Sequence, residues 1–310
     1  MHVQFAIKSS IVKRAEVSMK TAIMTASYVA DFERCALLCE SMDRFMQGQC
    51  HHYLLVEDND VKLFKTLEGA KRTVVSESEL FPAWLRAFPD PFSLGRRRVW
   101  LSPFSLPLRG WHAQQLRRLA MSRLVEADAL LSIDSDVVLV RPFDPADLWS
   151  DGRLRMFRAD NGAHDATPGH LAWLAHAGDI LGLPQRPDPA HDYISNMVAW
   201  RMDTARALLD HVEARSGKSW IRAVIASRDI SECMIYGRFA DEILGGAGHR
   251  PDARSLSHVL WFKETFPQTS EGLADFMSGL RPDQVAIGVQ SFVGHPLSEI
   301  RRLAFSVTPV

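Results

Sequence analysis

The chain has 310 residues, with 36 basic and 37 acidic side chains and four cysteines. This length allows one large α/β domain or two small ones with a sizeable core, and the balanced charge argues against a general nucleic-acid binder. The cysteines show neither zinc-ligand spacing nor the density of a disulfide scaffold, and no apolar run approaches the roughly 18–20 residues of a membrane span, so we expect a reduced, cytoplasmic protein.

Residues 1–19 are expected to be an N-terminal extension, with Met19 as an alternative start. The basic residues before 21–30 resemble those of a signal peptide. However, the apolar part is short, contains two threonines and leads directly into a helical pattern. We therefore predict a core strand over 21–27 and a helix over 32–45 that is capped by Asp31.

The next segments predict strands at 52–56 and 72–76 with a helix at 61–68 between them. Such alternation is typical of an α/β domain with a parallel sheet. Glu57 and Asp58 directly follow the first of these strands, where a carboxylate can hold a ribose or a base edge of a bound nucleotide. The alternative is that they cap the following helix.

Residues 77–110 contain five prolines and two glycines. We expect a long irregular segment, which in a compact domain is usually functional or mobile. Its Arg96-Arg97-Arg98 run is either a solvated basic loop or a contact to a pyrophosphate or an anionic acceptor.

Residues 111–125 have apolar side chains at the spacing of an amphipathic helix. Trp111, Gln115 and Arg118 fall together on another side of it. Because the helix turns directly into the next strand, Gln115 and Arg118 are candidates to line a cofactor-binding site, and Arg118 can reach a phosphate or a carboxylate there.

The apolar run at 130–133 is typical of a buried strand, and Asp134 and Asp136 follow at its end. Side chains two apart on a strand point to the same side, so both carboxylates can converge on one object. Two negative charges at the edge of a core are costly unless a cation neutralises them. Mg²⁺ and Mn²⁺ are hard cations that prefer carboxylate oxygens. The pattern predicts a metal site at the carboxyl edge of the sheet. A solvated turn or a helix cap is the alternative.

Farther on we predict a strand at 197–200 and a helix at 203–215 with Asp203 as its N-cap. His191, Asp192 and Asn196, before this strand, are candidates to hydrogen-bond acceptor hydroxyls. Three later aromatic residues are expected in the core rather than as a sugar platform. They are Trp261, Phe262 and Phe266.

Glu232 is expected to begin a buried helix with its side chain near a cavity. One interpretation makes it the general base of an inverting transfer. The other makes it a first-turn glutamate that stabilises the helix N-terminus, with Ser231 or Asp229 as the cap.

Several segments resemble the nucleotide-sugar-dependent glycosyltransferases of the GT-A fold. They are Gly-Trp-x-x-Gln-Gln-x-x-Arg-Leu at 110–119, Ile-Asp-Ser-Asp-Val-Val at 133–138, Arg-Pro-Phe at 141–143, Ser-Glu-x-x-x-Tyr-Gly at 231–237 and His-Val-Leu-Trp at 258–261. More particularly, the chain resembles a bacterial family of unknown function that is associated with surface-polysaccharide synthesis. The resemblance implies an α/β, GT-A-like fold: a Rossmann-like mixed sheet flanked by helices, with C-terminal elaborations. We expect a single domain over 20–295 and a tail over 296–310.

The resemblance also implies roles for individual residues. Asp134 would lie near the donor ribose and the metal, Asp136 would ligate the metal, and Arg118 stands where related enzymes carry a basic residue near the donor. His258 is the candidate third ligand, with a packed or capping role as the alternative and His295 as a weaker rival. A divalent ion and an arginine both stabilise a departing diphosphate.

Together these expectations describe a metal-dependent, hexosyltransferase-like glycosyltransferase with Asp136 and Glu232 as its catalytic carboxylates. It would use Mn²⁺ or Mg²⁺ and move a sugar from a nucleoside-diphosphate sugar to a glycan or lipid-linked acceptor in bacterial surface-polysaccharide synthesis. The expected location is cytoplasmic, with peripheral contact at the inner face of the membrane left open. The alternatives are a nucleotidyltransferase, a nucleotide-sugar hydrolase, or a noncatalytic protein that binds a sugar nucleotide or a glycan.

Overall fold

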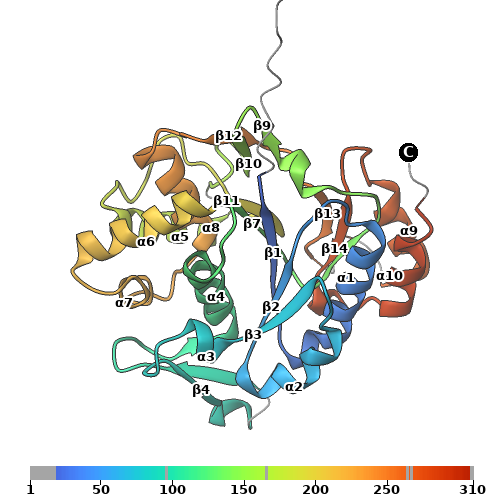
Figure 1. Ribbon diagram of the computed structural model, residues 1–310, viewed down its shortest axis with the longest axis horizontal. Coiled ribbons are helices and arrows are strands. Elements are labelled where there is room, and N and C mark those ends of the chain that lie inside the picture. Colours follow the sequence, from blue (N-terminus) through green and yellow to red (C-terminus); the bar gives the residue numbers. More distant parts are fainter. Residues whose placement is uncertain (1–18, 95–96, 165–166, 263–264, 266–267, 308–310) are drawn as a thin grey trace, which may run out of the picture.

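The computed structural model describes residues 19–94, 97–164, 167–262, 265 and 268–307. A five-stranded sheet in the order β11-β7-β1-β2-β3 lies at its centre (Figure 1). The strands are β1 (Thr21–Ala26), β2 (His52–Val56), β3 (Arg72–Ser76), β7 (Ala129–Ile133) and β11 (Met197–Arg201). All neighbours pair in parallel except β11, which is antiparallel to β7. This mixed sheet confirms the predicted α/β class.

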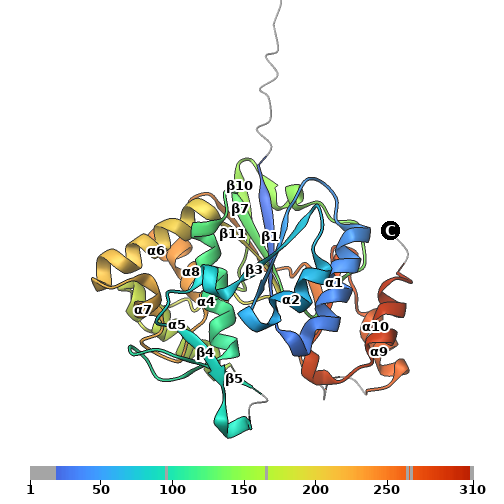
Figure 2. The same ribbon diagram turned by 60° about the horizontal axis from the view of Figure 1, so that its bottom comes forward.

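Helices cover both faces of the central sheet because its strands are apolar on both sides. In β1, Met24 packs into the core beneath α4, α6 and α8, whereas Ile23 packs into the core beneath α1. Figure 2 shows the sheet between these two groups of helices. Their bounds are α1 (Phe32–Phe45), α4 (Gly110–Leu124), α5 (Pro168–Leu181), α6 (Met202–Ser216), α7 (Trp220–Val224) and α8 (Glu232–Arg238).

The C-terminal part adds a smaller sheet in the order β13-β14-β8 beside α1. Its strands are β8 (Val137–Leu139), β13 (Ser257–Leu260) and β14 (Ala286–Val289), and the helices over it are α9 (Ser270–Ser278) and α10 (Leu297–Ala304). Ile300 and Ala304 of α10 are buried against this sheet, so the segment expected to be a tail includes a packed helix. A further sheet contains β9 (Trp149–Ser150), β10 (Arg153–Phe157) and β12 (His249–Asp252). Residues 1–18 and 308–310 lie outside the described residues.

The segment 77–110, predicted to be irregular, contains several short elements of secondary structure. It forms α3 (Glu77–Leu80) and an antiparallel sheet of β4 (Arg86–Pro89), β5 (Arg98–Leu101) and β6 (Leu108–Arg109). The prolines fall at strand ends and in the connections, where no ladder hydrogen bond is lost. The Glu77 carboxylate accepts hydrogen bonds from Trp100 Nε1 at 2.9 Å and from Arg117 Nη2 at 2.7 Å, which ties the small sheet to α4. Arg96 lies outside the described residues.

Two helix boundaries differ from the prediction. The helix expected over 61–68 is α2 (Val61–Phe64) followed by a 3₁₀ turn at Lys65–Leu67. In α6, Arg201 occupies the N-cap position, and Asp203 lies in the first turn, where its carboxylate pairs with the Arg201 guanidinium. The pairing competes with the predicted capping role.

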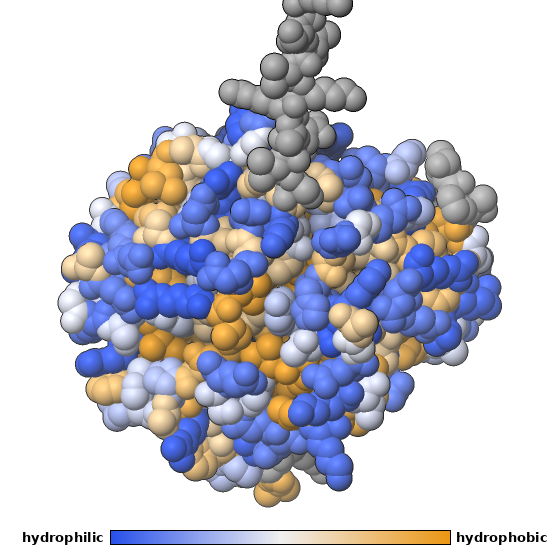
Figure 3. All heavy atoms as spheres, viewed as in Figure 1, coloured by the Kyte–Doolittle hydropathy of each residue, from blue (hydrophilic) through white to orange (hydrophobic). Residues whose placement is uncertain are grey.

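None of the helices within the described ranges combines the length and the apolar composition that a membrane crossing requires. Figure 3 shows hydrophilic side chains over both flanks of the face seen in Figure 1, with hydrophobic side chains gathered mostly toward the middle.

Gly237 in α8 provides a test of the packing that positions this helix. A Cβ at this position would overlap the Tyr193 ring, which is buried and donates a hydrogen bond to Asp241 Oδ2 at 2.8 Å. We predict that Gly237→Ala lowers the free energy of unfolding by about 1–3 kcal/mol in denaturant titrations, because overpacking forces neighbours to shift.

The matched control is Gly69→Ala, where an added Cβ meets nothing within 4 Å. That substitution should change the free energy of unfolding by no more than about 0.5 kcal/mol. Equal effects of the two substitutions would contradict the packing argument.

Candidate functional site

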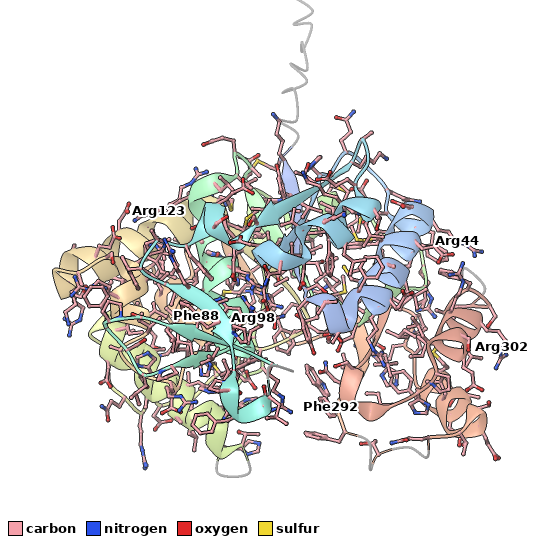
Figure 4. All side chains as sticks on the ribbon, turned by 90° about the horizontal axis from the view of Figure 1, so that it is seen from below. Arg44, Phe88, Arg98, Arg123, Phe292 and Arg302 are labelled. Atoms are coloured by element: carbon pink, nitrogen blue, oxygen red, sulfur yellow. The ribbon has the colours of Figure 1, made fainter. Side chains whose placement is uncertain are left out.

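A cleft of about 1320 Å³ opens at the carboxyl edge of the central sheet. Residues that follow three parallel strands line it: Ser27 after β1, Glu57 after β2 and Asp134 after β7. In Figure 4, which views the molecule from below, Arg98 lies on the small β4–β5–β6 sheet, and Phe292 lies to its right on the C-terminal part of the chain. The position agrees with the rule that open α/β sheets bind ligands at this edge.

The Asp-Ser-Asp segment forms a turn rather than part of a strand. β7 ends at Ile133 and β8 begins at Val137, and the Val137 N–H donates to the Asp134 carbonyl oxygen at 3.1 Å. The expectation that strand alternation aligns the two aspartates is therefore wrong, because the chain leaves the central sheet here to start the smaller one. Both side chains nevertheless line the cleft.

The Asp136 side chain is partly buried beside the Asp134 carboxylate. Its Oδ1 atom is buried and has no hydrogen-bond partner among the residues that the structure describes. Burial, together with the neighbouring Asp134 carboxylate, raises the pKa of Asp136 to about 7. A hard divalent cation would satisfy this oxygen and offset the repulsion between the carboxylates, so these residues fit such an ion.

Arg118 joins the turn to α8. Its guanidinium is 8% exposed and donates through Nη2 to the Asp134 carboxylate and through Nη1 to Glu232 Oε1, the latter at 2.7 Å. Burial alone would lower the pKa of Arg118, but the two carboxylates raise it, so the group stays cationic. One turn earlier on α4, Gln115 Oε1 accepts the backbone N–H of Glu232 at 3.0 Å. Two side chains of α4 thus hold the start of α8.

Glu232 begins α8 as predicted, and the Ser231 hydroxyl accepts the Met234 N–H as its cap. The Glu232 side chain lines the cleft but is only 5% exposed. Its carboxylate is engaged by Arg118, so it could take a proton from an acceptor only by weakening a buried ion pair.

Of the two carboxylates that directly follow β2, Glu57 lines the cleft and Asp58 does not. Burial raises the pKa of Glu57 to about 7, although Arg98 Nε lies 3.1 Å from its carboxylate. Asp58 instead accepts hydrogen bonds from the Ser76 hydroxyl and, at 3.1 Å, from the Ser78 N–H. It therefore fixes the end of β3 rather than lining the cleft.

The structure does not bring His258 to the aspartates. Its ring stacks on Phe276 with centroids 4.3 Å apart, and its Nε2–H donates to the Phe276 carbonyl oxygen at 2.9 Å. His295 is buried, and neither of its ring nitrogens has a hydrogen-bond partner within the described chain. In that same part of the chain, no three His, Cys, Asp or Glu side chains are grouped closely enough to share a metal ion. A bound ion would take its remaining ligands from water and a phosphate.

Several aromatic residues that were not predicted to belong to the site line the cleft. Trp111, His170 and Trp173 all border it. The sequence indicated only the first of these, because Trp111 shares a helix face with Arg118. Trp261 also borders the cleft and is 41% exposed, so the expectation that it lies in the core is wrong. Phe262 is likewise exposed, because both residues follow β13 at the surface. Phe266 lies outside the described residues.

We find no curated protein whose sequence matches this chain. Among solved structures, mouse xyloside xylosyltransferase 1 in its apo form is 12% identical with a TM-score of 0.46, over 89% of this chain and 100% of that one. The apo form of the glycosyltransferase GlyE from Streptococcus pneumoniae TIGR4 is 11% identical with a TM-score of 0.44, over 94% of this chain and 61% of that one. At these scores we draw no conclusion about activity. The model of a family of unknown function, DUF6492, matches residues 15–291, and the chain therefore belongs to that family.

Proposed function

We propose that this protein is a metal-dependent glycosyltransferase whose donor is a nucleoside-diphosphate sugar. The observation that carries the proposal is the buried Arg118 guanidinium held between Asp134 and Glu232 in a cleft that Asp136 also lines. A fixed cation beside paired carboxylates, at the carboxyl edge of a parallel sheet, suits a diphosphate group and its counter-ion.

Asp134 and Asp136 would hold the divalent ion, Mn²⁺ or Mg²⁺. Support comes from the unpartnered Asp136 Oδ1 atom and from the two-carboxylate donor set, since Mg²⁺ is commonly bound by one or two carboxylates together with substrate phosphates. When bound, such an ion neutralises the charge that develops on a departing diphosphate.

The protein's own residues supply orientation and a fixed positive charge. Arg118 cannot turn away from the cleft without breaking two ion pairs, so its charge is preorganised for the leaving group. Glu57 and Ser27, after adjacent strands, are placed to hydrogen-bond a nucleoside. Glu232, in this arrangement, positions Arg118.

The acceptor in this proposal is a glycan or a lipid-linked glycan, as in surface-polysaccharide synthesis. Exposed apolar side chains on and beside the small sheet support a lipid-linked acceptor presented at a membrane surface. They include Phe88, Phe92, Leu94, Leu101 and Leu106. Residues 86–109 also carry five arginines against one acidic residue, which favours anionic headgroups.

Ligand-dependent stability tests the donor site. With Mn²⁺, we predict that one nucleoside diphosphate at about a hundredfold above its Kd stabilises the protein by roughly 2.7 kcal/mol in thermal unfolding. Asp136→Asn keeps the side-chain shape but removes the charge, so the metal-dependent part of the shift should disappear.

The control is Asp210→Asn on α6, whose side chain is 73% exposed and pairs with surface Arg123. It should respond to the nucleotide as the parent does. An Asp136→Asn protein with the parent's metal-dependent shift would remove the basis of the proposal, and release of pyrophosphate instead of nucleoside diphosphate would identify a nucleotidyltransferase.

Glu232 variants separate a positioning role from the predicted general base. If Glu232 holds Arg118, the amide of Glu232→Gln still accepts the Arg118 hydrogen bond, and turnover should fall by no more than about tenfold. Glu232→Ala leaves one side of Arg118 unpaired and should cost about a hundredfold. The measurement is nucleoside-diphosphate release from the nucleotide sugar selected by thermal unfolding. A loss of about 10²–10⁴ for both variants would instead identify a general base.

A further inference from the structure

A wall of aromatic rings borders the cleft beside the Arg118 cluster. Trp111 lies in the first turn of α4, and His170 and Trp173 lie in the first two turns of α5. The Trp111 and Trp173 ring centroids are 5.2 Å apart, and the His170 ring stacks on Trp173 at 5.0 Å. All three residues line the cleft, and Trp111 is 44% exposed. The other two residues are partly exposed, and such a group of packed aromatic side chains offers an apolar platform within a polar cleft.

Helix geometry sets the distance between this aromatic platform and the charged floor of the cleft, which consists of Arg118, Asp134, Asp136 and Glu232. Trp111, Gln115 and Arg118 occupy positions i, i+4 and i+7 of α4, so they share one helix face. At 1.5 Å per residue, the Trp111 and Arg118 backbones are separated by roughly 10 Å along the helix axis. A diphosphate beside Arg118 therefore leaves room for sugar units between it and the aromatic wall.

His170 is oriented by a carboxylate. Its Nδ1–H donates to Asp192 Oδ2 at 2.7 Å, while Asp192 Oδ1 accepts the Ile194 N–H at 2.9 Å. Backbone hydrogen bonds in both directions with Ala159 also hold Asp192 in place. In the neutral ring, this hydrogen bond favours the tautomer whose Nε2 carries no proton, and no hydrogen bond engages Nε2 within the described residues. Glu232, in contrast, is committed to Arg118.

We propose that Trp111, Trp173 and His170 form the acceptor subsite, that it binds a pyranose ring by its C–H face, and that His170 is the proton acceptor. The inference deepens the proposed function and rests on it. In the transfer step, the proton of the acceptor hydroxyl moves to His170 Nε2 as its oxygen forms a bond to the anomeric carbon of the donor sugar. The bond from that carbon to the diphosphate oxygen breaks, and its electron pair leaves with the nucleoside diphosphate. Asp192 stabilises the resulting imidazolium.

The test measures donor and acceptor binding separately, on the full chain with Mn²⁺. Calorimetric titrations would use UDP and GDP as donor probes, and methyl glycosides of glucose, galactose, mannose and N-acetylglucosamine as acceptor probes. We expect Trp111→Ala and Trp173→Ala to weaken glycoside binding at least about tenfold and to leave nucleotide binding within about threefold. Trp111→Phe and Trp173→Phe should restore most of the glycoside affinity because they keep an aromatic face.

His170→Ala tests the proton transfer. It should leave the nucleotide binding constant within about threefold of the parent value while slowing sugar transfer at saturating acceptor at least about a hundredfold, the usual contribution of a general base. The matched controls are Trp84→Ala and His51→Ala, at residues that do not line the cleft. Both should behave as the parent does.

Four results would overturn the subsite. In the first two, the tryptophan variants bind glycosides as the parent does, or they lose nucleotide affinity rather than glycoside affinity. In the third, the parent binds a nucleotide but no glycoside in the panel. In the fourth, His170→Ala keeps full transfer activity. Each of these leaves nucleotide binding by the parent, and with it the proposed function, in place. If the parent binds neither UDP nor GDP and no other nucleoside diphosphate stabilises it in thermal unfolding, the proposed function is removed, and the subsite with it.

Discussion

The buried charge of Arg118 is the constraint on which the arrangement of the cleft depends. A guanidinium removed from water must be paired, and its partners here come from two segments far apart in the sequence, the turn after β7 and the first residue of α8. Helix α4, the turn and α8 must therefore keep their relative positions for the fold to be stable. The same pairs keep the charge directed at the cleft, so one interaction serves both the fold and the site.

Neighbouring contacts reinforce this constraint along α4. Gln115 receives the first N–H of α8, and Arg117, on the opposite side of the helix, is tied through Glu77 to the small sheet that borders the cleft. The helix thus connects the floor of the cleft to one of its walls. A helix that is hydrogen-bonded to elements on several sides has little freedom to shift, which suits a site that must hold a charged group in one place.

The sequence predicted what depends on local pattern. The strands of the central sheet, α4 and the start of α8 at Glu232 all follow from apolar periodicity and capping residues. It did not predict the β4–β5–β6 sheet, because its short strands are separated by prolines and are held by the long-range pairing of Trp100 and Arg117 with Glu77. For the same reason His170 and Asp192 could not be recognised as a pair, since their contact depends on how α5 packs and not on their spacing of 22 residues.

For the proposed function, the negative charge at the floor of the cleft bears on how a metal ion and a diphosphate would bind there. The carboxylates of Asp134, Asp136 and Glu232 outnumber the Arg118 guanidinium that lies among them, so negative charge is in excess at this point of the cleft. Burial, together with the Asp134 carboxylate, raises the pKa of Asp136. A diphosphate that entered alone would add to this excess and be repelled by carboxylates in a partly desolvated site. A divalent cation that accompanies the diphosphate reverses the sign of that interaction, because each carboxylate then attracts the complex. In the proposed function, the same carboxylates that hold Arg118 in place would therefore make nucleotide binding depend on the ion.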